Sequence, residues 1–230
     1  MGRRMNKESF WPSYVDIMTT LFAIMVILFV VSFSRFRNSE EELQKFAGKY
    51  KEIEAIYDAV AKIDSNYFEF NKDYVKHIFK IQVTFQTGRF NIEDELQADL
   101  YNPSVADSLR REIISAGHEI ERTILRLQRT HANQDIKYLV VIEGQASKDG
   151  YGRNDYYNND VLSYQRALNL RKFWQANGID FSSMSKCELV VSGSGEGGVP
   201  REFGDESLNQ RFLIHIVPVI GNIKLKTDSN

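Results

Sequence analysis

The sequence predicts an α+β fold with one N-terminal transmembrane helix, a juxtamembrane helix and then a two-layer α/β domain. Three observations indicate this order. A long apolar run lies near the N-terminus, a charged segment with helical periodicity follows it, and strand-like and helix-like patterns then alternate. We expect an N-terminal tail, the three parts and a C-terminal tail over residues 1–11, 12–36, 37–64, 65–222 and 223–230.

Composition excludes several classes of protein. The 230 residues carry 29 Lys and Arg against 31 Asp and Glu, so there is no basic excess for binding nucleic acid. The single cysteine, Cys187, cannot form an internal disulfide and lies in an apolar run, which predicts a buried structural thiol. The four histidines lack metal-ligand spacing, and hydrolase motifs are missing from the sequence. We therefore expect no enzymatic activity, no cofactor, no metal site and no nucleic-acid partner.

The apolar run from Tyr14 to Phe36 fits a membrane span. It has the roughly 20 residues that a bilayer core of about 30 Å requires, and Trp11 and Tyr14 suit its interface. Because no small-residue cleavage site follows it, we expect the run to stay as an anchor. Basic residues lie at both ends and favour a cytoplasmic N-terminus only weakly: Arg3, Arg4 and Lys7 precede the run, and Arg35 and Arg37 follow its apolar part, which ends at Phe33.

Asp16 lies inside this apolar run, where a charge costs about 2.5 to 3.5 kcal/mol on insertion scales. On a helix, Thr20 shares the face of Asp16, and Thr19 is its i+3 neighbour. Such a carboxylate must face protein or water, which implies a second membrane chain. Two interpretations stay open: Asp16 takes up and releases a proton, or it lies near the headgroups and pairs with a basic residue of the partner.

The segment 38–64 has apolar residues at alternating spacings of three and four, typical of a heptad seam. This seam could pack on the chain's own domain, or it could pair two copies of the chain. Its members are Leu43, Phe46, Tyr50, Ile53, Tyr57 and Val60.

Strand and helix signals then alternate along the domain. Asn102 and Pro103 are typical of the start of a helix, and Asn177-Gly178 of the end of one. Alternating or continuous apolar residues indicate strands. We expect strands at 75–85, 138–143, 188–192 and 212–217, with helices at 104–129 and 162–176.

Arg166 is the leading candidate for ligand binding. We place it in the first turn of the helix that begins near Leu162, where free backbone N–H groups favour a carboxylate. The alternative is an ordinary solvated or ion-paired arginine. A second motif, from Gly193 to Gly198, matches a dinucleotide pattern, but Val199-Pro200 follows where a helix should begin. We therefore expect no nucleotide site.

The order of motifs resembles a known family. The residues Trp11, Tyr14, Asp16, Met18 and Thr19 resemble the opening of the membrane helix in MotB-type stator subunits. The distal motifs resemble an OmpA-type peptidoglycan-binding domain, and the two resemblances together cover residues 10–218. These motifs are Ile142-Glu-Gly144, Leu162-Ser163-x-x-Arg166-Ala167, Gly193-x-Gly195-Glu196-x-x-Val199-Pro200 and Asn209-Gln-Arg211-Phe212.

The resemblance implies a proton-conducting, wall-anchored stator subunit. Asp16 would bind the proton, with Thr19 and Thr20 lining the path. The partners would be a second copy of this chain, a multi-span MotA- or ZorA-like subunit in a 5:2 complex, and peptidoglycan. The chain would cross the inner membrane once, with a cytoplasmic N-terminus and a periplasmic domain. The implied peptidoglycan-binding residues are Asn159, Leu162, Arg166, Asn209 and Arg211.

One departure from the family pattern affects the expected site. Where the family has G-H-T-D, whose Asp meets the amine of diaminopimelate, this chain reads Gly144-Gln-Ala-Ser147, so Asp149 or Asp155 would have to supply the carboxylate. The B subunits of Zorya anti-phage defence systems share the layout and have similar spacings to Asn159, Leu162 and Arg166. We therefore favour a defence stator over a flagellar one. A passive envelope tether without ion conduction is the rival from another class.

Overall fold

The computed structural model describes residues 11–98, 100–132, 136–154 and 156–220. The chain divides into two compact units, the first ending at Glu52 and the second beginning at Ile53. The expected tails at 1–10 and 223–230, and the candidate Asp155, lie outside the described residues.

The predicted transmembrane and juxtamembrane helices form one unbroken helix, α1 (Trp11–Ala61). Its apolar part is exposed along its whole length. Within the described ranges it is the one helix long and apolar enough to cross a membrane. Apolar side chains exposed at every position around a helix are what a lipid environment accepts and water does not.

The two ends of the heptad seam differ. Leu43, Phe46 and Tyr50 in the first unit are exposed by 66%, 39% and 69%. In the second unit, Val60 and its neighbour Ile56 are buried in the domain core, and His77 Nε2 donates to Val60 O at 3.0 Å. The distal end of the seam therefore packs on the chain's own domain. Pairing of two copies through the exposed end stays a prediction.

The second unit is built on a five-stranded sheet in the order β1-β2-β7-β3-β6. Strands β3 and β6 are parallel, and the other neighbours are antiparallel. Alternate residues of β3 are buried, as expected for a strand with one face on the core. The strands are β1 (Phe68–Asn71), β2 (Lys76–Phe79), β3 (Ile136–Gly144), β6 (Cys187–Gly193) and β7 (Phe212–Ile220).

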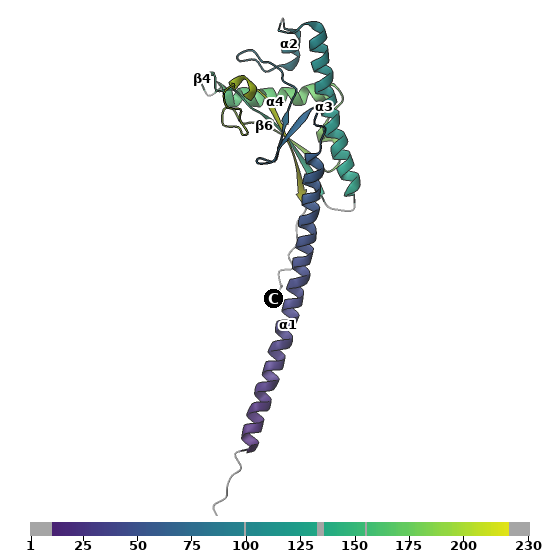
Figure 1. Cartoon of the computed structure of the whole chain (residues 1–230), viewed down its shortest axis with the longest axis vertical. Coiled ribbons are helices and arrows are strands. Elements are labelled where there is room, and N and C mark those ends of the chain that lie inside the picture. The colour runs from purple at the N-terminus through teal and green to yellow at the C-terminus, as the bar shows by residue number, and fades with distance from the viewer. Residues whose placement is uncertain (1–10, 99, 133–135, 155, 221–230) are drawn as a thin grey trace, which may run out of the picture. The chain divides into compact units, whose positions relative to one another are not determined.

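Helices complete the second layer. Figure 1 shows α4 (Asn159–Ala176) crossing the strands, with α3 (Pro103–Thr130) beside it. Trp174 Nε1 of α4 donates to Ile113 O of α3 at 2.8 Å, which joins the two helices inside the core. The short helix α2 (Ile92–Gln97) contacts both. The predicted α+β architecture, with one long apolar N-terminal helix and a two-layer domain, is thus confirmed.

Element boundaries show where local patterns were sufficient. Helix α3 begins as predicted, because Asn102 Oδ1 accepts from Val105 N at 2.9 Å and Pro103 follows. The strand predicted over 75–85 was too long, since β2 ends at Phe79. Ile81, Val83 and Phe85 keep the alternating burial without a strand ladder, and Thr84 N donates to Tyr101 Oη instead.

Several short elements lie outside the strands and helices that the sequence predicted. They include β1, α2, the hairpin of β4 (Gly152–Asn154) and β5 (Tyr157–Asn158), and the 3₁₀ turns η1 (Phe181–Ser183) and η2 (Glu206–Asn209). Each has six residues or fewer, which is too short for a periodic pattern. The predicted structural thiol, Cys187, is half-buried at the start of β6, and burial raises its pKa to about 11.

Candidate functional site

The start of α4 organises the candidate site. The helix begins at Asn159, three residues earlier than predicted, because Asn158 caps it by accepting from Val161 N at 2.9 Å. Arg166 therefore lies in the third turn of α4. The prediction that it lies in the first turn, among free backbone N–H groups, was wrong. Asn159, Leu162 and Arg166 instead share one helix face, each at most 4% exposed.

Asn159 contacts two loops at this end of the sheet, the loop after β3 and the loop after β6. Its Nδ2 lies 3.0 Å from Ser147 O, 3.0 Å from Asp149 Oδ1 and 2.7 Å from Glu196 Oε1. An amide nitrogen has two N–H groups, so three acceptors exceed its capacity. The carboxylates of Asp149 and Glu196 can therefore accept a hydrogen bond from another donor.

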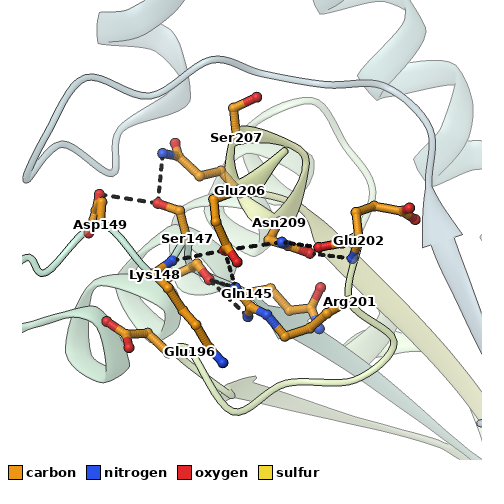
Figure 2. A network of polar contacts seen from close by, with 12 residues as sticks. Gln145, Ser147, Lys148, Asp149, Glu196, Arg201, Glu202, Glu206, Ser207 and Asn209 are labelled. Atoms are coloured by element: carbon orange, nitrogen blue, oxygen red, sulfur yellow. Dashed lines mark hydrogen bonds and ion pairs between the residues drawn. The ribbon is translucent and has the colours of Figure 1, made fainter. Parts of the chain in front are cut away.

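Asp149 lies two residues after Ser147, the last residue of the stretch Gly144–Ser147. It is exposed, and it accepts from Ser147 Oγ at 3.1 Å and from Tyr151 N at 3.0 Å (Figure 2). Partial burial acts to raise the pKa of Asp149, but the hydrogen bonds from Asn159, Tyr151 and Ser147 outweigh it and lower that pKa. Asp149 is therefore an ionised acceptor open to solvent.

Arg166 is almost completely buried, with 3% exposure. Its Nε donates to Arg89 O at 3.0 Å, and its guanidinium carbon lies 4.5 Å from the centroid of the Phe85 ring. Among the described residues, Nη1 and Nη2 donate to no acceptor, and no carboxylate oxygen lies within 4.0 Å. Burial lowers the pKa of Arg166 to about 10, although the charges of Asp149 and Glu95 oppose this. The guanidinium stays cationic at neutral pH and has unused donors.

Glu95 is a buried acid that the sequence did not indicate. It lies on α2 with no exposed surface, and its Oε2 accepts from Gln86 N at 3.2 Å. Its Oε1 has no hydrogen-bond partner in the described structure, and Arg89 Nε stands 3.9 Å away. An isolated acid in a six-residue helix gives no sequence signal, because α2 is too short to show a periodicity.

Asn209 and Arg211 have a different environment from Arg166. Asn209 is fully buried; its Nδ2 donates to Glu202 O at 3.0 Å and to Glu206 Oε2 at 3.2 Å, and its Oδ1 accepts from Glu202 N at 2.8 Å (Figure 2). Arg211 donates to Gln145 Oε1, Pro200 O and Glu202 Oε1 at 3.0 to 3.3 Å. Both side chains hold the loop between β6 and β7 in place.

A charged group near the end of β3 was also missed by sequence reasoning. The Glu143 carboxylate, 6% exposed, accepts from Lys76 Nζ at 2.9 Å and lies 2.6 Å from His215 Nε2. Burial acts to raise the pKa of Glu143, but hydrogen bonds from His215, Lys76 and Ser194 lower it to about 2. Strands β2, β3 and β7 bring these residues together, and no local pattern reveals such a contact.

The membrane candidate lies in the first unit. The Thr19 hydroxyl donates to Val15 O at 2.7 Å, and the Thr20 hydroxyl donates to Asp16 O at 2.8 Å. Both hydroxyls therefore bind backbone carbonyls of their own helix. Within the described residues, the Asp16 carboxylate makes no hydrogen bond or ion pair.

Comparisons with known proteins give only structural similarities. No family model matches the sequence, and no curated protein matches it. The cell wall anchor of the type VI secretion system from Pseudomonas aeruginosa is 14% identical over 73% of this chain and 96% of that chain, with a TM-score of 0.36. A putative MotB-like protein from Desulfovibrio vulgaris is 14% identical over 79% and 96%, with a TM-score of 0.34. The periplasmic domain of Helicobacter pylori MotB is 11% identical over 66% and 88%, with a TM-score of 0.36.

The chain's own geometry defines its class. It is an α+β domain with a buried, incompletely bonded polar site, preceded by a helix long and apolar enough to cross a membrane. The structures to which it is similar are titled as a wall anchor and as MotB or MotB-like proteins. The sequence motifs resemble proteins of the same kinds.

Proposed function

We propose that this chain is a wall-anchored stator subunit of an ion-driven membrane motor, with no catalytic chemistry of its own. The observation that carries the proposal is that one chain holds two charged groups without full partners. Asp16 has none on its own exposed apolar helix, and Arg166 has unused donors inside the domain. Each needs a group from another molecule, because unpaired charge in a low-dielectric setting is costly.

The wall site requires a ligand with both a carboxylate and an amine. Arg166 supplies two N–H-bearing nitrogens for the carboxylate, and ionised Asp149 supplies an acceptor for the amine. The diaminopimelate part of a peptidoglycan stem peptide has both groups. Asn159 positions Asp149, Leu162 gives the site an apolar wall, and Asn209 and Arg211 shape it by holding the loop before β7.

Replacing Arg166 tests the wall site. In the full-length chain in detergent, Arg166→Ala is expected to weaken cosedimentation with purified peptidoglycan by at least about 10-fold, since a charge-assisted pair is lost. Arg122→Ala, which removes an exposed guanidinium from α3, is the control and should bind like the wild type. If Arg166→Ala and the wild type cosediment equally with peptidoglycan, Arg166 is not the main residue that binds the wall carboxylate.

The membrane site requires a partner chain. Because Thr19 and Thr20 bind backbone carbonyls, they line the surroundings of Asp16 without holding its carboxylate. We propose that a multi-span MotA- or ZorA-like subunit surrounds Asp16 in a 5:2 complex and that Asp16 carries a proton. The two copies of this chain would pair through Leu43, Phe46 and Tyr50, which are exposed. The chain would cross the inner membrane once, with its domain in the periplasm.

Asp16→Asn separates a motor from a passive tether. In vesicles containing the chain and its multi-span partner, we expect proton flux to fall to background while the two proteins still copurify, because the amide keeps the shape but cannot exchange a proton. Ser13→Ala on the same helix face is the control. Full flux in the Asp16→Asn vesicles would rule out the relay.

We propose anti-phage defence as the output. The altered stretch Gly144–Ser147 and the spacing of Asn159, Leu162 and Arg166 support this choice over a flagellar motor. The neighbouring genes test it: a helicase or nuclease gene beside this one fits defence, whereas flagellar genes would contradict it.

A further inference from the structure

One turn of the chain contacts the almost completely buried Arg166 side chain. Its Nε donates to the carbonyl of Arg89 at 3.0 Å, and the Phe85 ring lies against its guanidinium. Between these two residues the chain makes a tight turn, in which Arg89 N donates to Gln86 O at 3.0 Å. The turn of residues 86–89 therefore lies against a side chain that is only 3% exposed and has unused donors.

The turn is firmly held at its ends and open on its outer side. Phe85 and Ile92 are buried, and Ile92 N donates to Asn169 Oδ1 on α4 at 2.8 Å. Between them, Gln86, Thr87 and Arg89 are exposed, and Phe90 is 40% exposed. Such a segment, with few buried contacts between two anchored ends, has the local stability expected of a lid.

The inner side of the turn touches the second half of the site. Gly88 has φ +75°, and a Cβ added there would lie 3.0 Å from Tyr151 Oη. Tyr151 is the residue whose N–H donates to Asp149. The turn therefore lies against Arg166 on one side and against the loop that carries Asp149 on the other.

We propose that residues 86–89 are an autoinhibitory lid, in which the Arg89 carbonyl occupies Arg166 Nε, so that a wall carboxylate cannot pair with Nε and the adjacent Nη of the guanidinium together. This inference rests on the proposed wall binding and adds its regulation. An ionised carboxylate forms a stronger hydrogen bond with a guanidinium than a neutral carbonyl does, so a stem peptide displaces the Arg89 carbonyl and the turn opens. The closed state lowers apparent affinity by the fraction of molecules in which the turn is shut.

Gly88→Ala tests the lid in the full-length chain in detergent. The added methyl crowds Tyr151 and strains the φ of the closed turn, so it favours the open turn. We expect binding to purified peptidoglycan to tighten by about 3- to 10-fold, in line with removal of a conformational penalty. Gly178→Ala is the matched control, because φ there is +81° with no atom near the added Cβ, and its binding should be unchanged.

Hydrogen exchange gives a second measurement. Soluble stem-peptide fragments should speed exchange at the Arg89 amide, which the closed turn protects, and slow it around Asp149. Unchanged or weaker wall binding by a folded Gly88→Ala, or slower Arg89 exchange with ligand, would overturn the lid. In that case loss of binding by Arg166→Ala would still support the wall site. If neither the wild type nor Gly88→Ala binds, both proposals fail; binding by Gly88→Ala alone supports the lid.

Discussion

Two buried asparagine-arginine groups lie at the polar end of the domain, and they differ in how fully they are bonded. In the braced group, Asn209 and Arg211 have protein acceptors for their donors. In the open group, Asn159 faces more acceptors than it can serve, and Arg166 has donors for which the described part of the chain offers no acceptor. Since buried polar groups in folded proteins are nearly always paired, incomplete pairing marks the place for a ligand.

The same contrast applies to two buried acids. Glu143 is bound by Lys76 and His215, whereas Glu95 has one oxygen without a partner. A carboxylate with complete partners contributes to stability, and one without them costs stability unless a ligand supplies what is missing. Variants at the fully bonded and the incompletely bonded members of these pairs should therefore respond differently.

The largest expected effect is the acid sensitivity of Glu143. Its pKa is about 2 in the fold against an ordinary 4.5, so its charged form is favoured by folding. Because the folded pKa is the lower one, this contribution is fully present above pH 4.5 and is lost as pH falls toward 2. The shift corresponds to about 3 kcal/mol of unfolding free energy.

Glu143→Gln isolates this contribution from those of other carboxylates. The free energy of unfolding of the variant and of the wild type should differ most at neutral pH, and the difference should shrink below pH 4.5. Denaturant titrations followed by tryptophan fluorescence, with Trp174 fully buried as a reporter, measure it. A difference that stays constant from pH 7 to pH 3 would show that Glu143 is not held in its charged form.

Asn209→Ala gives the next effect. The substitution leaves Glu202 N and Glu202 O without their partner, which costs about 2 kcal/mol of unfolding free energy, whereas the Glu206 oxygen still accepts from Arg201 and Lys148. Leu208→Ala beside it, where the side chain is 40% exposed, serves as the control and should cost less than about 1 kcal/mol. If Asn209→Ala instead weakened wall binding without loss of stability, Asn209 would belong to the open group.

The sequence predicted most of the fold and one side of the site. Asn102 and Pro103 located the start of α3, and continuous apolar runs located β3, β6 and β7. Asn159, Leu162 and Arg166 were expected in one site, and the structure places them on one buried helix face. The resemblance named these residues, and helical spacing predicted a shared face for Leu162 and Arg166, whereas Asn159 was expected to precede the helix.

The remainder depends on contacts that are distant in sequence. Lys76 and His215 reach Glu143 because β7 pairs with both β2 and β3. The cap residue Asn158, which places the start of α4 earlier than predicted, is the last residue of a two-residue strand that carries no pattern. Arg89, whose carbonyl accepts from Arg166, lies 77 residues earlier in the chain. Periodicity reports on neighbours along one element, so it could not place these groups together.

Glu95→Gln is expected to give the smallest effect, and its size tests the distinction between complete and incomplete partners. The glutamine side-chain oxygen can still accept from Gln86 N, so the turn keeps this hydrogen bond. The amide removes a buried charge that has an unpaired oxygen, which favours folding, but it also removes a countercharge from buried Arg166. Because these terms oppose each other, we expect unfolding free energy to change by less than about 1 kcal/mol. A loss of unfolding free energy as large as that of Asn209→Ala would mean that the Glu95 carboxylate is already fully paired. The hydrogen bonds and ion pairs would then not distinguish Glu95 from Glu143.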